Sequence, residues 1–283
     1  MALPPYSIAG GSVPGAKRFL DYDPAYATAN QDGFLTCAFG DYLIVLVGDG
    51  CSESSNAQVG MKTSLRTFAK QIAYLCNNPG NHQPFTNFWW LQLEEEFREA
   101  LRVSAEDLVL PGQNLGKILA EYFLFSFVGA IITPSTAHIF GCGDGIYGID
   151  GTWFGVERFK NNQPPYFAYQ LIDGHCGWSR EEVSLAVFAE VPMGTFSWLG
   201  LASDGVIPLL EPAQLFVPGT TNKVPHLNSL CTDPTTFSNP HRLKQFLLTL
   251  VRPSYRLGGN PAELVIEEGV LYDDPTLVAV RFA

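Results

Sequence analysis

The stretch Tyr42–Gly50, YLIVLVGDG, places an unbroken apolar run directly before a carboxylate that stands between two glycines. A short apolar run that ends in turn residues is typical of a strand buried on both faces. Asp49 would then be held at the end of a rigid strand, and its glycine neighbours would let a ligand approach the main chain. On this stretch alone, an ordinary Asp-Gly turn explains the sequence equally well.

Four further segments repeat the placement of an acid at the end of an apolar, strand-like run. They are Thr136–Gly145 (TAHIFGCGDG, with Asp144), Ser197–Gly205 (SWLGLASDG, with Asp204), Tyr272–Arg281 (YDDPTLVAVR, with Asp273 and Asp274 before the strand) and Asn30-Gln31-Asp32, which opens the strand before Asp49.

Carboxylates that a sheet gathers at one edge repel one another, and this repulsion raises their pKa values. A divalent cation relieves the repulsion, and hard cations such as Mg²⁺ and Mn²⁺ take oxygen ligands from Asp, from backbone carbonyls and from water. The recurrence therefore predicts a metal site at a sheet edge, with Asp32, Asp49, Asp144, Asp204 and Asp273 as candidate residues.

Composition narrows the class of protein. The 283 residues are 46% hydrophobic and 16% charged, which provides enough apolar material for one large domain or two small ones. The net charge of −11 would repel phosphates, so we expect no nucleic-acid partner, although solubility alone explains most acidic proteins. No apolar run reaches membrane-spanning length and the N-terminus lacks a signal-peptide core, so we expect no membrane partner.

The six cysteines are scattered and form no CxxC pair, which argues against a zinc site or a disulfide scaffold and favours a cytoplasmic location. Cys37 and Cys142 lie in apolar runs, and we expect both thiols to be buried.

The order of elements indicates an α+β fold with mainly antiparallel sheets, because helices come in blocks and do not alternate regularly with strands. Residues 1–29 are predicted to be irregular apart from a short strand near Ser7–Ala9, and 158–182 and 211–236 to be surface excursions. Strands are predicted at 33–39, 42–47, 123–132, 146–149, 152–156, 183–191, 197–203 and 277–282, and in the run 136–145 before the turn at Asp144. Helices are predicted at 57–75, 86–109 (Thr86 as N-cap) and 239–251 (Asn239 as N-cap).

The ordered motifs Asn30-Gln31-Asp32, Gly48-Asp49-Gly50, Gly143-Asp144-Gly145, Ala202-Ser203-Asp204-Gly205 and Asp273-Asp274-Pro275-Thr276 resemble those of the metal-dependent protein phosphatases of the 2C type. The resemblance covers about residues 30–282. It implies one domain over 1–283, built as a four-layer αββα sandwich in which helix pairs flank two antiparallel sheets, with 158–182 as a flap.

The resemblance also implies two Mn²⁺ or Mg²⁺ ions, with a third at a weaker site. Asp49 would bridge the main pair, the carbonyl of Gly50 would bind one ion, and Asp204 and Asp273 would hold the other. Asp32 would act through water, and Asp144 would share the third site with Asp204. Asp274 would be a neighbour and not a ligand.

A phosphatase of this kind hydrolyses phosphoserine or phosphothreonine with a water whose pKa the metals lower. Asp49, Asp204 and Asp273 would be its catalytic carboxylates, and no protein nucleophile is needed. The resemblance implies a phosphorylated protein or peptide as substrate and a cognate kinase as a further partner.

Three departures from the family pattern leave other interpretations open. Cys51 stands where some members have a His proposed as general acid, Ala27-Thr28-Ala29 contains no phosphate-clamping Arg, and Gly145 replaces a Ser. The nearest basic residues are Lys17 and Arg18. A pseudophosphatase that keeps the fold and binds a partner is one alternative, and an α+β domain whose acids are only turn residues is another.

Histidines offer no competing site. Asp173-Gly174-His175-Cys176-Gly177 resembles the family's Asp-Gly-His motif but follows the third motif, in the wrong order, so we assign it to the flap. His138 falls in a strand pattern and is expected to be packed or hydrogen-bonded, and no pair of histidines has metal-ligand spacing.

Overall fold

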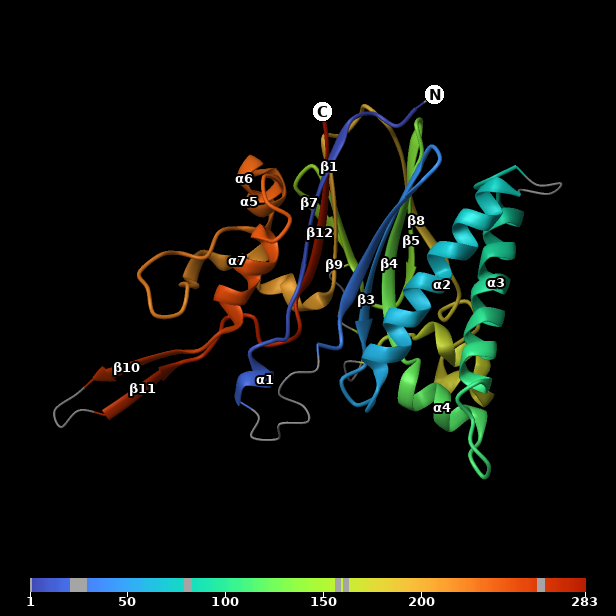
Figure 1. Cartoon of the computed structure of the whole chain (residues 1–283), viewed down its shortest axis with the longest axis horizontal. Coiled ribbons are helices and arrows are strands. Elements are labelled where there is room, and N and C mark those ends of the chain that lie inside the picture. Colours follow the sequence, from blue (N-terminus) through green and yellow to red (C-terminus); the bar gives the residue numbers. More distant parts are fainter. Residues whose placement is uncertain (1, 21–29, 79–82, 156–158, 160–162, 259–262) are drawn as a thin grey trace.

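The computed structural model describes every residue except 1, 21–29, 79–82, 156–158, 160–162 and 259–262. Two five-stranded antiparallel sheets pack face to face (Figure 1). The first sheet has the order β1 (Tyr6–Ser12), β12 (Thr276–Phe282), β9 (Trp198–Ala202), β6 (Ile146–Ile149) and β7 (Thr152–Phe154); the second has β2 (Gly33–Phe39), β3 (Tyr42–Gly50), β4 (Phe125–Ile132), β5 (Thr136–Cys142) and β8 (Ala186–Pro192).

Helices cover the outer face of each sheet (Figure 1). Three pack on the β2–β8 sheet, namely α2 (Ala57–Asn77), α3 (Asn87–Glu106) and α4 (Leu115–Tyr122), and on the other side lie α5 (Leu227–Thr232), α6 (Pro234–Phe237) and α7 (Arg242–Val251). The layers therefore run helix, sheet, sheet, helix, which confirms the α+β sandwich of two antiparallel sheets.

Strand β3 is buried on both faces, as its apolar run predicts. Leu43, Val45 and Val47 point into the space between the sheets, where they meet side chains of β9 and β12. Ile44 and Leu46 point the other way and pack in the core under α2 and α3. Alternate residues of a strand face opposite sides, so one stretch of sequence joins two of the molecule's cores and fixes where Asp49 emerges.

The N-terminal segment is more regular than predicted. The short strand expected near Ser7–Ala9 is confirmed and extends over the seven residues of β1, and the short helix α1 (Lys17–Leu20) was not expected. Residues 1 and 21–29 of this segment lie outside the described residues. Strand β1 pairs with β12 along its whole length, from Tyr6 opposite Phe282 to Ser12 opposite Thr276. Its two glycines weaken the strand pattern. The structure needs Gly11 because an added Cβ would lie 2.7 Å from the backbone nitrogen of Lys244.

Helix α7 begins at Arg242, three residues after the predicted start. The side chain of Asn239 accepts a hydrogen bond from the backbone N–H of His241 at 2.8 Å, which closes a separate turn before the helix. Helix α4 is not among the predicted elements. The hairpin of β10 (Ser254–Gly258) and β11 (Glu263–Glu267), which projects from the body of the molecule in Figure 1, is not among them either.

The two cysteines expected to be buried differ. The Cys142 thiol is buried and donates to the carbonyl of Pro165 at 3.1 Å, as predicted. Cys37 is exposed, contrary to the prediction, because β2 is the edge strand of its sheet.

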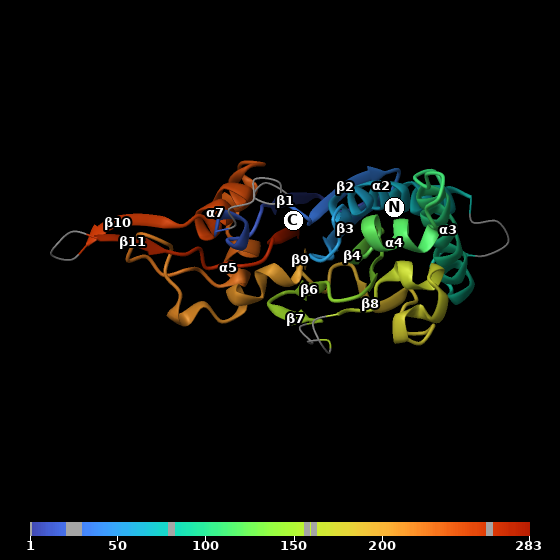
Figure 2. The same cartoon turned by 90° about the horizontal axis from the view of Figure 1, so that it is seen from below.

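The described part of the predicted flap is tied to the core. Residues Phe167–Leu171 form a 3₁₀ helix that lies beside α3 and α4, in yellow in Figure 2. Phe167 is fully buried, and its ring meets that of Phe68 edge-on at 6.1 Å between centroids. This anchor holds the segment against the second sheet; residues 158 and 160–162 of the predicted flap lie outside the described residues.

Helices α2 and α4 approach so closely at Gly60 that a side chain has no room. An added Cβ there would lie 1.7 Å from the carbonyl oxygen of Tyr122, whereas one at Gly116 of α4 would meet only the side chain of Asn114, at 3.6 Å.

We therefore expect Gly60→Ala to destabilise the protein by more than about 1 kcal/mol, because the overlap must force the helices apart. Gly116→Ala is the matched control and should be neutral or stabilise by up to about 1 kcal/mol, the intrinsic preference of a helix for Ala. Urea unfolding of both variants measures the difference. If Gly60→Ala proves as stable as Gly116→Ala, the helices are not packed as described.

Candidate active site and metal centre

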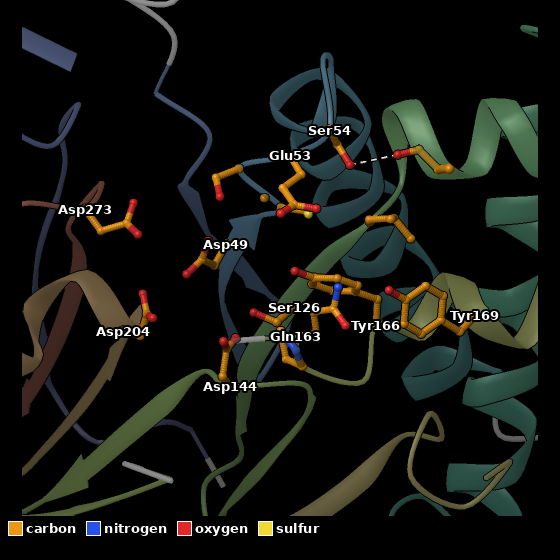
Figure 3. Close-up of a pocket in the computed structure, with 16 residues that line it drawn as sticks. Asp49, Glu53, Ser54, Ser126, Asp144, Gln163, Tyr166, Tyr169, Asp204 and Asp273 are labelled. Atoms are coloured by element: carbon orange, nitrogen blue, oxygen red, sulfur yellow. Dashed lines mark hydrogen bonds between the residues drawn. The ribbon is translucent and has the colours of Figure 1, made fainter. Parts of the chain in front are cut away.

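Carboxylates from separate elements meet at one end of the two sheets. Asp49 is the penultimate residue of β3, Asp144 follows β5, Asp204 follows β9, and Asp273 precedes β12. With Gly50 they line one side of a cavity of about 320 Å³, shown in Figure 3. Because β3 and β9 belong to different sheets, the cavity lies where the ends of the sandwich layers converge.

The acids lie close enough to change one another's ionisation. Asp49 is within hydrogen-bond contact of Asp32 and of Asp204. Burial first, and then the charges of neighbouring carboxylates, raises the pKa of Asp49 well above its usual range. Burial, followed by the charges of Asp144 and Asp273, raises the pKa of Asp204 to about 6.

Asp32 and Asp144 complete the group. Asp32 is 1% exposed, and burial followed by the charge of Asp274 raises its pKa well above the usual range. Burial also raises the pKa of Asp144, against the opposing effect of a hydrogen bond with Ser126. All five acids and Gly50 that the sequence singles out are thus brought to one place.

The donor set fits a hard, hydrated cation. Oxygen Oδ2 of Asp32 is buried and has no hydrogen-bond partner in the described part of the chain, which is costly for a carboxylate unless a cation or ordered water satisfies it. Among the described residues, no three His, Cys, Asp or Glu side chains surround a single point as metal ligands. Mg²⁺ tolerates such a layout, because it commonly keeps several waters and takes one or two carboxylates.

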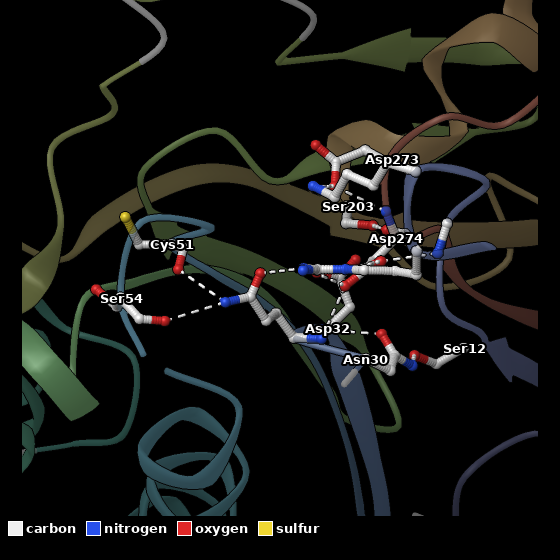
Figure 4. A network of polar contacts seen from close by, with 12 residues as sticks. Ser12, Asn30, Asp32, Cys51, Ser54, Ser203, Asp273 and Asp274 are labelled. Carbon is white, nitrogen blue, oxygen red and sulfur yellow. Dashed lines mark hydrogen bonds and ion pairs between the residues drawn. The ribbon is translucent and has the colours of Figure 1, made fainter. Parts of the chain in front are cut away.

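The adjacent acids Asp273 and Asp274 have different surroundings. Asp273 faces the cavity and pairs with the ammonium group of Lys17. Asp274 is 2% exposed and accepts hydrogen bonds from the backbone N–H groups of Gly15 and Gln31, at 2.7 and 2.8 Å (Figure 4). Its carboxylate is thus occupied by the protein itself, in agreement with the expectation that Asp274 is not a ligand.

Arg18 and Gln31 connect Asp274 to the loop after Asp49 (Figure 4). The buried guanidinium of Arg18 lies 3.3 Å from Asp274 and donates to the side-chain oxygen of Gln31. The amide nitrogen of Gln31 in turn donates to the carbonyls of Cys51 and Ser54, at 3.1 and 3.2 Å. Sequence reasoning missed this network, since no motif marks Arg18 and the partners lie far apart along the chain.

The opposite wall of the cavity comes from the predicted flap. Tyr166 and Tyr169 face the carboxylates across the cavity in Figure 3, and Cys51 packs against the cluster that Tyr166 and Tyr169 form. Burial raises the pKa of Tyr166 far above its usual value, so the phenol stays protonated. The aromatic residues of Pro165–Tyr169 could have predicted a packed segment here, but the polar residues around them indicated a surface excursion.

His138 and the Asp173-Gly174 pair of the rejected motif do not line this cavity. Asp173-Gly174 is exposed and belongs to the short 3₁₀ helix Asp173–Gly177. This position agrees with the assignment of the motif to the flap. His138 is buried, stacks on Phe85 at 4.0 Å between ring centroids, and lies 3.1 Å from a carboxylate oxygen of Glu190. It is packed and hydrogen-bonded, as predicted. Residues 27–29, where the family's Arg is absent, lie outside the described residues.

Solved structures of phosphatases share this architecture. A bacterial serine phosphatase superimposes with a TM-score of 0.55 at 12% identity, covering 98% of this chain and 97% of that one. The serine/threonine phosphatase Stp1 of Staphylococcus aureus gives 0.51 at 12% identity, covering 100% and 98%. The chain has the fold of the 2C-type phosphatases. At such identities the likeness establishes the fold and leaves the activity to be tested.

A structure of the PP2C phosphatase domain of SpoIIE from Bacillus subtilis with part of its regulatory domain is also similar, with a TM-score of 0.48 at 11% identity, and the chain spans 64% of that longer structure. No family model matches the sequence, and a search of curated proteins gives no match either. Among the described helices, none combines the length and the apolar character needed to cross a membrane.

We expect Asp274→Asn to cost about 3–5 kcal/mol of stability, because it leaves the buried Arg18 without its charge partner. Asp273→Asn is the matched control one residue away and should change stability by about 1 kcal/mol or less, because its ion pair is partly exposed. Chemical denaturation without divalent cations measures both. Equal effects of the two substitutions would contradict the different surroundings of the two acids.

The raised pKa values predict the pH dependence of the metal-free protein. A carboxyl whose pKa is higher in the folded state binds more protons there, so its contribution to stability falls as the pH rises from about 4, the unfolded value, through the folded pKa. For Asp204 this window ends near pH 6. In EDTA, Asp204→Asn should therefore melt at a higher temperature than the wild type at pH 7.5, with a smaller difference at pH 5. If Asp204→Asn and the wild type differ in melting temperature by the same amount at both pH values, the repulsion between Asp204 and its neighbouring carboxylates is refuted.

Proposed function

We propose that this chain is a metal-dependent phosphatase that hydrolyses phosphoserine or phosphothreonine in a protein or peptide. The observation that carries the proposal is the gathering of carboxylates from separate segments at one end of the two sheets, in a fold shared with serine/threonine phosphatases. Asp49, Asp144, Asp204 and Asp273 line the cavity, and Asp32 is buried close to Asp49. Unpaired acids at such short range are unfavourable in a purely structural role, whereas they are the ligands that Mn²⁺ and Mg²⁺ prefer.

We assign to each acid the role that the family resemblance implies. Asp49 lies between Asp32 and Asp204 and would bridge the two main ions, with the Gly50 carbonyl as a further ligand. Asp204 and Asp273 would hold the second ion. Asp32 is buried, and one of its oxygens has no hydrogen-bond partner among the described residues; it would act on the first ion through water. Asp144, which lines the cavity together with Asp204, would form a third site with it. When bound, the ions lower the pKa of a water and neutralise charge on the phosphoryl oxygens.

The rest of the site orients the substrate. The loop Cys51–Ser54 is fixed from two sides: Gln31 binds its carbonyls, and the Ser54 hydroxyl donates to the Ala120 carbonyl of α4 at 2.7 Å. Tyr166 and Tyr169 close the far side of the cavity, which restricts water and leaves room for a phosphorylated side chain.

We assign to two residues the roles of the Arg and the His that the family has and this chain lacks. Lys17 pairs with Asp273 and brings a positive charge to the cavity edge, where it can bind a phosphoryl oxygen in place of the absent Arg. Tyr166, which remains protonated and contacts Cys51, is the hydroxyl available to donate a proton near the place of the family's His. A phenol is a weaker acid than an imidazolium, so turnover of alkyl phosphates should be slow relative to that of aryl phosphates.

The test is hydrolysis of p-nitrophenyl phosphate and of a phosphothreonine peptide by the purified chain with Mn²⁺, with Mg²⁺ and with EDTA. We expect turnover with Mn²⁺ that EDTA abolishes and that Asp49→Asn reduces by at least about 100-fold, because this carboxylate would bridge both ions. Glu181→Gln, the same kind of change at an exposed acid outside the cavity, is the control and should retain most of the activity. A wild-type protein that binds Mn²⁺ but hydrolyses neither substrate would instead be a pseudophosphatase with a binding role.

A further inference from the structure

Strand β2 leaves one edge of its sheet open. In the sheet order β2-β3-β4-β5-β8, it pairs with β3 on one side, and the described residues place no strand on the other. Alternate residues of such an edge strand present backbone N–H and C=O groups outward, where another chain can pair with them.

A groove of about 670 Å³ runs between this edge and helix α2. Leu35, Cys37 and Phe39 of β2 line one wall, all on the face of the strand that looks toward α2. Ala69 and Ala73 form part of the other wall, and their small side chains leave room beside the strand. Most of this lining is apolar, although the Cys37 side chain is exposed.

Two cationic side chains lie on the α2 side of the groove. Arg66 and Lys70 are exposed, lie one turn apart on α2, and both line the groove. Among the described residues neither forms an ion pair, whereas Arg98 and Arg102 of α3 are paired with glutamates of their own helix. In a chain with a net charge of −11, two unpaired cations beside an apolar groove mark the surface as complementary to an acidic and apolar partner.

We propose that β2 and α2 bind an extended segment of a partner protein, which adds to the sheet as a new strand next to β2. Its alternate apolar side chains fill the groove toward α2, and acidic side chains pair with Arg66 and Lys70. In strand addition the backbone hydrogen bonds supply much of the affinity, and side-chain pockets supply the specificity. The open backbone edge favours an extended segment over a helix, because a helix has no free main-chain groups to offer along its length.

The proposal is independent of the phosphatase activity. The groove begins at Leu35 and extends toward the β2–β3 turn, whereas Asp32 lies before the opposite end of β2. A partner bound there would leave the acidic cavity open, so this surface would recruit a protein without blocking the site.

The first step of the test selects the occupant. A display library of random peptides of about eight residues, a typical strand length, is selected against the immobilised full-length chain. We expect the enriched peptides to alternate Val, Ile or Leu with other residues and to carry Asp or Glu. The best of these is then synthesised with a fluorescent label, and its affinity for the chain is measured by anisotropy.

The second step places the peptide in the groove. The double variant Arg66→Glu/Lys70→Glu should weaken binding by at least about tenfold, roughly 1.4 kcal/mol, and Cys37→Arg should do the same by filling the groove. The matched control Lys223→Glu/Lys244→Glu makes the same change in net charge at exposed positions outside the groove and should bind like the wild type. Amide hydrogen exchange of residues 34–39 should slow when the peptide binds.

Several results would overturn the proposal. These are failure to enrich any peptide, enrichment of helical or basic sequences, equal weakening by both double variants, and amide protection outside β2. Concentration-dependent dimerisation of the wild type that Arg66→Glu/Lys70→Glu abolishes would assign the groove to a second copy of the chain. Thermal melting and circular dichroism establish that each variant is folded before its affinity is interpreted.

Discussion

The repulsion among carboxylates at one edge of the sandwich is the constraint on which the site depends. Asp32, Asp49 and Asp204 are in contact, and burial denies them the water that would screen their charges. A fold can maintain such a cluster only if its strands are rigid enough to resist the repulsion. Strand β3, buried on both faces in two separate cores, provides that rigidity.

A network of polar contacts next to the carboxylates maintains their arrangement. Asp274 binds the N-terminal segment, Arg18 links it to Gln31, and Gln31 fixes the loop after Asp49. These contacts join the N-terminal segment, the residues on either side of the β2–β3 hairpin and the segment before β12. It explains why two adjacent acids can have opposite roles, one facing the cavity and one serving the fold.

The sequence predicts the parts of the fold that local patterns determine. The apolar run of β3, the helical spacing after residue 57 and the acids at strand ends are all local, and the structure has them where they are expected. The full length of strand β1, beyond the short strand expected near Ser7–Ala9, and the role of Tyr166 could not be predicted in this way. The glycines of β1 are explained only by contacts with Phe34 and α7, and the position of Tyr166 depends on the burial of its neighbour Phe167.

The central claim is that the clustered acids hold divalent cations, and calorimetric titration of Mn²⁺ into the metal-free chain tests it most directly. The account predicts binding of at least two ions per chain by the wild type and loss of this binding in Asp49→Asn, with Asp274→Asn excluded as a comparison because it disturbs the fold. Absence of Mn²⁺ and Mg²⁺ binding by a folded wild-type protein would contradict the account, since the cluster would then consist of structural carboxylates without a cation.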